Sequence, residues 1–301
     1  IRSVIRVLDV APMREEMRGF LKRAAEYTLT PMPAMLRLGT RAPGLGDAQS
    51  MRKVYRLGDV TPDRMTGARE KVLEVLRDYG GLSFTLGEVA EMASVGTSVV
   101  KGLVKLGAVS EEEAPRDTPY PQLDPDYGGK ELSADQSAGA EALRTALRTD
   151  TYGTTLLKGV TGSGKTEVYL EAVAECLRMG RQALVLLPEI ALSGEFINRV
   201  EARFGMKPAE WHSGVTMTER RRCWRMVGQG DAQLVVGARS ALFLPYQNLG
   251  LIVVDEEHDT SYKQEDGVLY NARDMAVLRA AINGAQVVLA SATPSLESWA
   301  N

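Results

Sequence analysis

Residues 159–166 read Gly159-Val160-Thr161-Gly162-Ser163-Gly164-Lys165-Thr166 and fit the phosphate-loop pattern G-x-x-x-x-G-K-[ST] without a departure. A β-branched and aliphatic stretch at 154–158 predicts a short buried strand before it. Apolar residues at helical spacing predict a helix after it, from Glu167 to Met179. In this order, backbone N–H groups at the helix start point at an anion. The stretch therefore predicts a nucleotide site; a glycine-rich turn without a ligand is the plainer alternative.

Each chemical role at this loop has a candidate residue. The glycines allow the backbone to wrap a phosphate without a Cβ clash. We expect Lys165 to contact the β- and γ-phosphates and the Thr166 hydroxyl to ligate Mg²⁺. All eight residues from Gly159 to Thr166 are therefore predicted to bind the nucleotide.

A second polar motif, Asp255-Glu256-Glu257-His258, directly follows four aliphatic residues at 251–254. A carboxylate at the end of such a strand can hold the Mg²⁺ of a bound nucleotide, which is the role we predict for Asp255. Glu256 can accept a proton from the water that attacks the γ-phosphate. We expect His258 to couple this motif by hydrogen bonds to Ser291-Ala292-Thr293. A solvated acidic turn is the alternative.

Alternating strands and helices from residue 131 onward predict an α/β fold of the P-loop NTPase type, with one parallel sheet and the polar motifs at its carboxyl edge. Before it, residues 46–114 predict a small winged-helix domain, with helices over 66–79, 86–93 and 97–106 and a strand from 107. The Pro- and Gly-rich residues 115–130 predict a linker. Near the start, we expect a strand over 1–8, a helix over 12–29 and then loops at Pro31, Pro33 and Pro43.

Two features leave alternatives open. The helix over 97–106 offers only Lys101 and Lys105 as cations and no Arg, Asn or Gln to read base edges, so this domain either contacts DNA phosphates or serves in packing. Ser133 is a candidate N-cap, and Gln136, three residues on, can pair with adenine N6 and N7. A single helical Gln is otherwise a solvated surface residue.

The composition, with 44% hydrophobic and 25% charged residues, is that of an ordinary globular protein. The net charge of −3 is unevenly distributed, since residues 1–110 are basic and the remaining residues are acidic. This weakly favours nucleic-acid contact by the N-terminal part of the chain. Two distant cysteines, Cys176 and Cys223, form no ligand pattern and fit a reduced, cytoplasmic setting. No apolar run predicts a membrane span. Because the chain starts at Ile1, we expect a piece of a longer protein.

The three motifs Gly159–Thr166, Asp255–His258 and Ser291-Ala292-Thr293-Pro294 resemble motifs I, II and III of superfamily 2 helicases. The amino-acid sequence between these motifs resembles that of the primosomal replication-restart helicases over residues 131–301. The stretches that carry this are Pro188-Glu189-Ile190-Ala191-Leu192, His212-Ser213-Gly214, Gly237-Ala238-Arg239-Ser240-Ala241-Leu242-Phe243 and Asp255–Gln264.

This resemblance implies that residues 131–301 are the first, RecA-like motor lobe and that residues 1–45 are the end of an N-terminal DNA-binding domain. It implies a 3′→5′ ATP-dependent DNA helicase that recognises stalled replication forks and initiates primosome assembly. ATP and Mg²⁺ are its implied cofactors. Its implied partners are forked and single-stranded DNA, single-strand-binding protein and the factors that load the replicative helicase. A monomer without a membrane partner is expected. The family's second motor lobe and zinc site would lie outside these residues.

Further roles come from matching this family residue by residue. Leu132 and Gln136 match the adenine-contacting motif. Four residues match segments that lie on the single-strand backbone: Pro188, Glu189, Arg239 and Ser240. Four more match an aromatic loop that senses DNA: Tyr262, Lys263, Tyr270 and Arg273. Val268-Leu269 stand where the family often has Trp-Arg, which weakens the expected base stacking. The alternative is that the two tyrosines pack the loop onto the sheet.

Three other classes share part of this pattern. A translocase or remodeller of the same superfamily would contain motifs I to III but would not unwind a fork. A P-loop switch or kinase would need only the phosphate loop. A fork-binding module would hold the nucleotide as a structural ligand.

Overall fold

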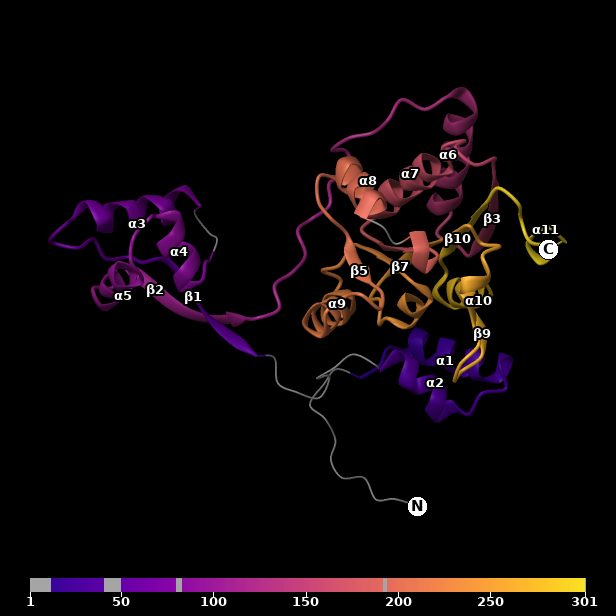
Figure 1. Ribbon diagram of the computed structural model, residues 1–301, viewed down its shortest axis with the longest axis horizontal. Helices are drawn as coiled ribbons and strands as arrows, with labels where there is room; N and C mark the ends of the chain where they lie inside the picture. The colour runs from indigo at the N-terminus through magenta and orange to yellow at the C-terminus, as the bar shows by residue number, and fades with distance from the viewer. Residues whose placement is uncertain (1–11, 41–49, 80–82, 192–193, 301) are drawn as a thin grey trace, which may run out of the picture. The chain divides into compact units, whose positions relative to one another are not determined.

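The computed structural model describes residues 12–40, 50–79, 83–191 and 194–300. They divide into two compact units, one drawn from both ends of the chain and one formed by residues 47–118 (Figure 1). The strand expected over 1–8 and the loop expected at Pro43 lie outside the described residues, as does Leu192. No helix of the described part is both long enough and apolar enough to span a membrane.

The first unit contains a six-stranded sheet whose paired strands all run parallel. The strands, in spatial order, are β3 (Gly153–Lys158), β10 (Gln286–Ser291), β7 (Leu249–Asp255), β4 (Gln182–Leu186), β6 (Leu234–Gly237) and β5 (Ala209–Trp211). The first three of these strands each lead into one motif. β3 precedes the phosphate loop, β10 ends at the third motif and β7 ends at the acidic motif. The three motifs therefore meet at one edge of the sheet. This confirms the predicted α/β fold with a RecA-like P-loop lobe.

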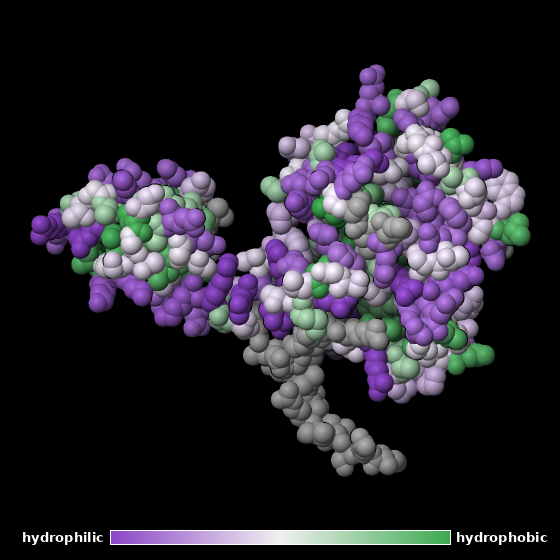
Figure 2. Space-filling view, viewed as in Figure 1, coloured by the Kyte–Doolittle hydropathy of each residue, from purple (hydrophilic) through white to green (hydrophobic). Residues whose placement is uncertain are grey.

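Helices cover both faces of this sheet. Successive side chains of a strand point to opposite faces and therefore enter two different hydrophobic cores. Leu184 of β4 belongs to one hydrophobic cluster, and its neighbours Ala183 and Val185 belong to the other. From residue 131 onward, the helices of this unit are α6 (Ala134–Arg148), α7 (Lys165–Arg178), α8 (Gly194–Phe204), α9 (Met217–Gln229), α10 (Ala272–Asn283) and the short α11 (Leu296–Ala300), which buries no side chain. Most of the surface seen in Figure 2 is hydrophilic, with hydrophobic atoms in small separate areas.

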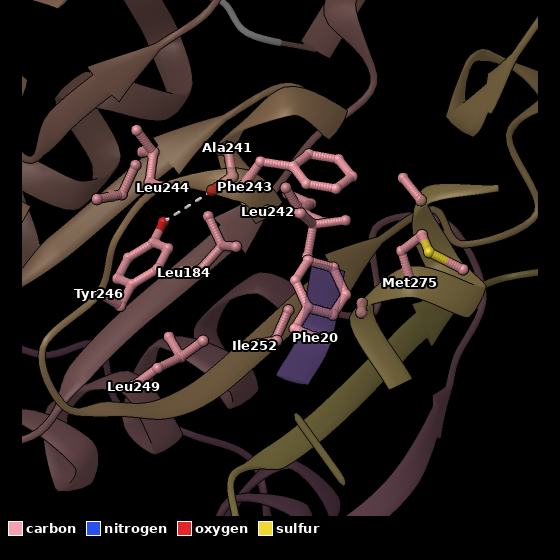
Figure 3. Packing of buried hydrophobic residues seen from close by; sticks show 14 of the residues in the cluster. Phe20, Leu184, Ala241, Leu242, Phe243, Leu244, Tyr246, Leu249, Ile252 and Met275 are labelled. Atoms are coloured by element: carbon pink, nitrogen blue, oxygen red, sulfur yellow. Dashed lines mark hydrogen bonds between the residues drawn. The ribbon is translucent and has the colours of Figure 1, made fainter. Parts of the chain in front are cut away.

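Two N-terminal helices, α1 (Glu15–Tyr27) and α2 (Met32–Gly39), complete one of these cores. Phe20 is fully buried, and its ring centroid lies 5.5 Å from that of Phe243. Figure 3 shows Phe20 among Phe243, Ile252 and Met275 of the sheet unit. The DNA-binding role expected for residues 1–45 stays a prediction; in the structure these helices pack on the P-loop lobe.

The expectation of loops after Pro31 is wrong, because α2 begins there. Pro31 occupies the N-cap and Pro33 lies in the first turn, where a proline costs nothing because the first helical N–H groups have no partner within the helix. The prolines that we interpreted as breakers are therefore compatible with a helix start.

The second unit has its own core and contains three helices and a two-stranded antiparallel sheet. The elements are β1 (Met51–Leu57), α3 (Gly67–Asp78), α4 (Leu86–Met92), α5 (Thr97–Lys105) and β2 (Val109–Pro115). The three helices lie where the sequence predicts them, whereas β1 was not predicted. Assignment to the winged-helix class stays a prediction.

Part of the stretch that we expected to be a linker is bonded to the sheet unit. The Leu123 N–H donates to Gln233 Oε1 at 2.8 Å, and Arg203 Nη1 donates to the Pro125 carbonyl at 2.9 Å. Leu123 itself is buried. Residues from 119 onward thus belong to the compact unit that holds the sheet.

Candidate active site

The phosphate loop depends on glycine at two positions. Gly162 and Gly164 have φ of +78° and +82°, a region that other residues rarely adopt. A Cβ on Gly164 would also collide with the Gln136 amide nitrogen. Gly164 is the N-cap of α7, so the loop leads directly into the helix whose N–H groups can face an anion.

Lys165 lies buried at the start of α7 with its ammonium group in the loop. Its Nζ donates to the Gly159 carbonyl at 2.9 Å and to the Val160 carbonyl at 3.4 Å. The same nitrogen is 3.8 Å from Glu256 Oε1. The cation is therefore close to both the loop backbone and the second motif, where it can bind phosphate oxygens.

Asp255 ends β7 and is held by a residue that the sequence did not reveal. The hydroxyl of fully buried Tyr169, from α7, donates to Asp255 Oδ2 at 2.9 Å. Burial raises the pKa of Asp255, and the neighbouring Glu256 carboxylate raises it further, while the Tyr169 hydrogen bond opposes this. A partly desolvated carboxylate of this kind gains from a bound cation.

The donor set fits Mg²⁺ held together with a nucleotide. Within the described residues no group of three or more His, Cys, Asp or Glu side chains forms a protein-only metal cluster. Mg²⁺ is typically bound by one or two protein oxygens together with substrate phosphates. The carboxylate of Asp255 and the hydroxyl of Thr166, next to Lys165, provide oxygen ligands of the type that Mg²⁺ prefers.

Glu256 has an unusual backbone conformation. Its φ is +46°, in the left-handed region, although it is not a glycine. Such a conformation costs roughly 1–3 kcal/mol and persists only where neighbouring contacts impose it. Here the Glu256 N–H donates to Asp255 Oδ1 at 3.1 Å, and the Glu257 N–H donates to the Ala290 carbonyl at 3.1 Å. The carboxylate of Glu256 remains partly exposed beside Lys165.

Glu257 is a second residue whose role the sequence did not reveal. Its buried carboxylate accepts from the Ser295 N–H at 2.7 Å, the Ser295 hydroxyl at 3.0 Å and the Ser298 hydroxyl at 2.8 Å. Arg273 Nη1 lies 3.4 Å away. Burial raises the pKa of Glu257, but these hydrogen bonds outweigh it and hold the pKa below its usual value. Glu257 thus ties the second motif to the segment after Thr293.

The three predicted coupling residues lie together. His258 Nδ1 is 2.7 Å from Ser291 Oγ and 3.7 Å from Glu256 Oε2. The Thr293 N–H donates to Ser291 Oγ at 3.1 Å, and the Gly159 N–H donates to the Ser291 carbonyl at 3.2 Å. Ser291 therefore contacts the phosphate loop, the acidic motif and the third motif.

Comparison with known proteins agrees with this geometry. Residues 137–301 match the DEAD/DEAH box helicase family. The chain belongs to this helicase family. It is 40% identical over 240 residues to the replication restart protein PriA of Bacillus subtilis, covering 79% of this chain and 30% of that protein. It is 55% identical over 147 residues to the protein of the same name from Rickettsia felis, covering 49% and 23% respectively.

The helicase chain thus spans less than a third of the length of these relatives. Among solved structures, RecG bound to a three-way DNA junction is 22% identical, with a TM-score of 0.44, covering 57% of this chain and 22% of that one.

Gln136, which is predicted to contact adenine, is hydrogen-bonded to protein atoms in this structure. It forms a capping box with Ser133, and its Nε2 donates to the Ser163 carbonyl at 2.8 Å. Leu132 lines a polar cavity of about 560 Å³ next to this helix start. Ser133 is an N-cap as predicted, while adenine recognition by Leu132 and Gln136 stays a prediction.

The residues predicted to lie on a DNA strand differ in exposure. Pro188 is buried and Glu189 is exposed. Arg239 Nη1 donates to the carbonyls of Ser261 and Lys263, each at 2.8 Å. Ser240 Oγ accepts the Trp211 indole N–H at 3.1 Å. Arg239 therefore holds the start of the predicted aromatic loop in this structure.

The predicted aromatic loop forms a short hairpin of β8 (Lys263–Gln264) and β9 (Tyr270–Asn271). Tyr262 is only 1% exposed, and the single proton of its hydroxyl is shared between the carbonyls of Leu186, at 3.0 Å, and Asp255, at 2.6 Å. Tyr270 is 8% exposed, with its ring edge-on to Phe243 at 5.3 Å. Both tyrosines pack in the lobe in this structure, as the alternative expects, and their role in sensing DNA stays a prediction.

Arg273 and Lys263, the two cations of this hairpin region, also differ. Arg273 is buried and pairs with Asp274 and Glu257. Lys263 is exposed. Of the four residues that matched the sensing loop, Lys263 is therefore the one whose side chain is open to a DNA strand in this structure.

Proposed function

We propose that this chain is the ATP-binding part of a DNA helicase that restarts replication at stalled forks. The observation that carries the proposal is the convergence of Lys165, Asp255 and Glu256 at one edge of the sheet. The likeness to replication restart proteins, whose sequences extend well beyond this chain, supports the choice of substrate. ATP, Mg²⁺, forked and single-stranded DNA, single-strand-binding protein and primosome factors are the proposed ligands and partners.

The chemistry follows from the positions of these side chains. Lys165 binds the β- and γ-phosphates, for which its ammonium group is already oriented by the loop carbonyls. Mg²⁺, when held by Thr166 and Asp255, would neutralise phosphate charge. Glu256 accepts a proton from the attacking water, because its carboxylate is partly exposed and lies beside Lys165. His258 and Ser291 connect this base to the third motif, whose proposed role is to relay DNA occupancy.

The resemblance also supports a 3′→5′ direction and a need for a second motor lobe. In two-lobed motors the cations that stabilise the transferring phosphoryl group come from the other lobe. The 301-residue chain should therefore bind Mg-ATP and Mg-ADP but hydrolyse ATP at least ~10³-fold more slowly than the full-length protein, which is the usual contribution of an arginine finger.

The test is a DNA-stimulated ATPase assay on the full-length protein beside the 301-residue chain. Stimulation by forked DNA together with strand separation is the expected result. Stimulation without strand separation would indicate a translocase or remodeller of the same superfamily. ATP turnover that ignores DNA would indicate a P-loop switch or kinase, and full turnover by the 301-residue chain would contradict the second-lobe requirement.

A further inference from the structure

A groove lies on the first unit between the α1–α2 turn and the β8–β9 hairpin. Its volume is about 640 Å³. Side chains from three parts of the chain line it, among them Leu29, Arg37, Trp211, Arg220, Ser240 and Leu269. The α1–α2 wall lies outside residues 137–301, the part that matches the helicase family. One side of the groove is therefore specific to the N-terminal helices.

Leu29 sits in this wall in a conformation that does not favour a leucine. Its φ is +52°, and 91% of its surface is exposed. The turn is held by backbone bonds from Thr28 to Ala24 and from Thr30 to Ala25, each 2.9 Å. A left-handed, solvent-exposed leucine contributes little to folding, since glycine or asparagine would adopt the conformation at lower cost. Leu269, on the hairpin side, is also mostly exposed, at 59%.

Two guanidinium groups, those of Arg37 and Arg220, line the same groove. Among the described residues, neither Arg37 nor Arg220 has a carboxylate oxygen within 4.0 Å of its nitrogens. Arg220 lies over the Trp211 ring at 5.3 Å, and its buried Nε has no hydrogen-bond partner within the part of the chain that the structure describes. Asp266, at the exposed hairpin tip, also lines the groove. Unpaired arginines on an apolar floor suit an anionic ligand that also has flat apolar faces.

We propose that this groove binds a nucleotide unit of single-stranded DNA, with the base against Leu29 and Leu269 and the flanking phosphates at Arg37 and Arg220. The inference rests on the proposed function, because it places part of the DNA path on this lobe. Ser240, which matches a segment on the single-strand backbone, lies in the same groove. The α1–α2 turn then acts as the second wall of the DNA site, opposite the hairpin.

The test uses fluorescence anisotropy of a labelled deoxythymidine oligomer with the 301-residue chain, with thermal unfolding measured in parallel. Leu29→Gly and Leu29→Asn should weaken binding about 5- to 20-fold, because the bound base no longer buries an apolar side chain. Their melting temperatures should stay equal or rise, because both residues tolerate a positive φ. A loss of DNA affinity with gained stability cannot come from unfolding.

Arg220→Gln should weaken binding about tenfold and lower the slope of log affinity against log salt concentration by about 0.7, the value for one phosphate contact on a single strand. Met206→Asn and Lys207→Gln are the matched controls, since they remove an exposed apolar side chain and a charge elsewhere on this unit. Both controls should bind as the unaltered chain does.

Two outcomes overturn the groove and can be distinguished. If the unaltered chain binds the oligomer and all three groove variants bind equally well, or the controls lose as much, the DNA path lies elsewhere and the proposed function stands. If the unaltered chain does not bind single-stranded DNA, the groove is refuted together with the DNA-binding part of the proposed function.

Discussion

The phosphate loop and the β8–β9 hairpin both follow strands at the same edge of one sheet, but they use their side chains in opposite ways. At the loop, Lys165 and Glu256 face each other at 3.8 Å with one carboxylate partly exposed. At the hairpin, Tyr262 and Tyr270 turn inward and pack within the lobe. Glycines and charged residues at the spacing of a phosphate loop are a specific signal, because few other structures need this pattern. Tyrosines and cations in a loop serve packing as well as binding.

The sharpest test of this contrast separates the two charged residues of the loop side. Glu256→Gln in the full-length protein should lower ATP hydrolysis by about 10²- to 10⁴-fold and leave ATP affinity nearly unchanged, because it removes only a proton acceptor. Lys165→Ala should instead weaken ATP binding by about 10- to 100-fold, the usual loss for hydrogen bonds to a charged group. Equal loss of affinity in both variants, measured by titration with a fluorescent ATP analogue, would contradict these roles.

The hairpin side should respond in stability. Tyr270→Ala should cost ~3–5 kcal/mol of unfolding free energy, as in other large aromatic truncations, because the ring packs on Phe243. Tyr262→Phe should cost ~1–3 kcal/mol, since two buried carbonyls lose their donor. Urea unfolding of the 301-residue chain measures both. A Tyr270→Ala chain as stable as the unaltered one, but with impaired DNA binding, would restore the base-stacking role.

Glu257 lies between the two regions and should affect catalysis as well as stability. Glu257→Gln leaves Arg273 without a charged partner in this motif and loosens the Ser295 segment. We expect kcat to fall about tenfold, equivalent to ~1.4 kcal/mol, at an unchanged KM for ATP. Glu175→Gln is the control, because Glu175 is also buried and pairs with Arg148 and Arg178, away from the loop. A matching fall in kcat in the control would reduce Glu257 to a structural role.

The smallest expected effect concerns pH. Because the pKa of Asp255 is raised in the folded chain, its ionised form disfavours folding. The stability associated with the protonated group is complete below the unfolded pKa, ~3.9, and is lost as pH rises through the folded value. Asp255→Asn should therefore raise the melting temperature at neutral pH in the absence of nucleotide, and the gain should disappear on acidification. A gain that is constant with pH would contradict this cause.

The sequence predicted the sheet, its motif edge and most helices, because each rests on a strong local pattern. It missed β1, whose residues Met51-Arg52-Lys53-Val54-Tyr55 mix charges with apolar side chains. It missed α2 because a proline breaks a helix interior and also starts a helix, and the two uses look alike in sequence. The spacing of apolar residues therefore predicts neither β1 nor α2.

Within the site, the sequence predicted the residues of the phosphate loop and the acidic motif, because nucleotide and Mg²⁺ binding require these residue types in a fixed pattern. Tyr169 and Glu257 were missed because their roles depend on tertiary contacts, with Asp255 in one case and with Ser295 in the other. A second glutamate next to Glu256 was a weak signal, since an acidic run after a strand is also typical of a solvated turn. The burial of Tyr262 could not be predicted, because its partners are backbone carbonyls of two separate strands.

The division of the sheet unit between both ends of the chain has a consequence for the order of synthesis. The helices α1 and α2 emerge from the ribosome before residues 47–118 and long before Phe243 and Met275, against which Phe20 packs. Until then the apolar faces of both helices have no core to enter. The second unit has its own core and can fold in the meantime. Closure of the P-loop lobe is thus a late, long-range event, and nascent chains that stop before α10 leave part of this apolar surface uncovered.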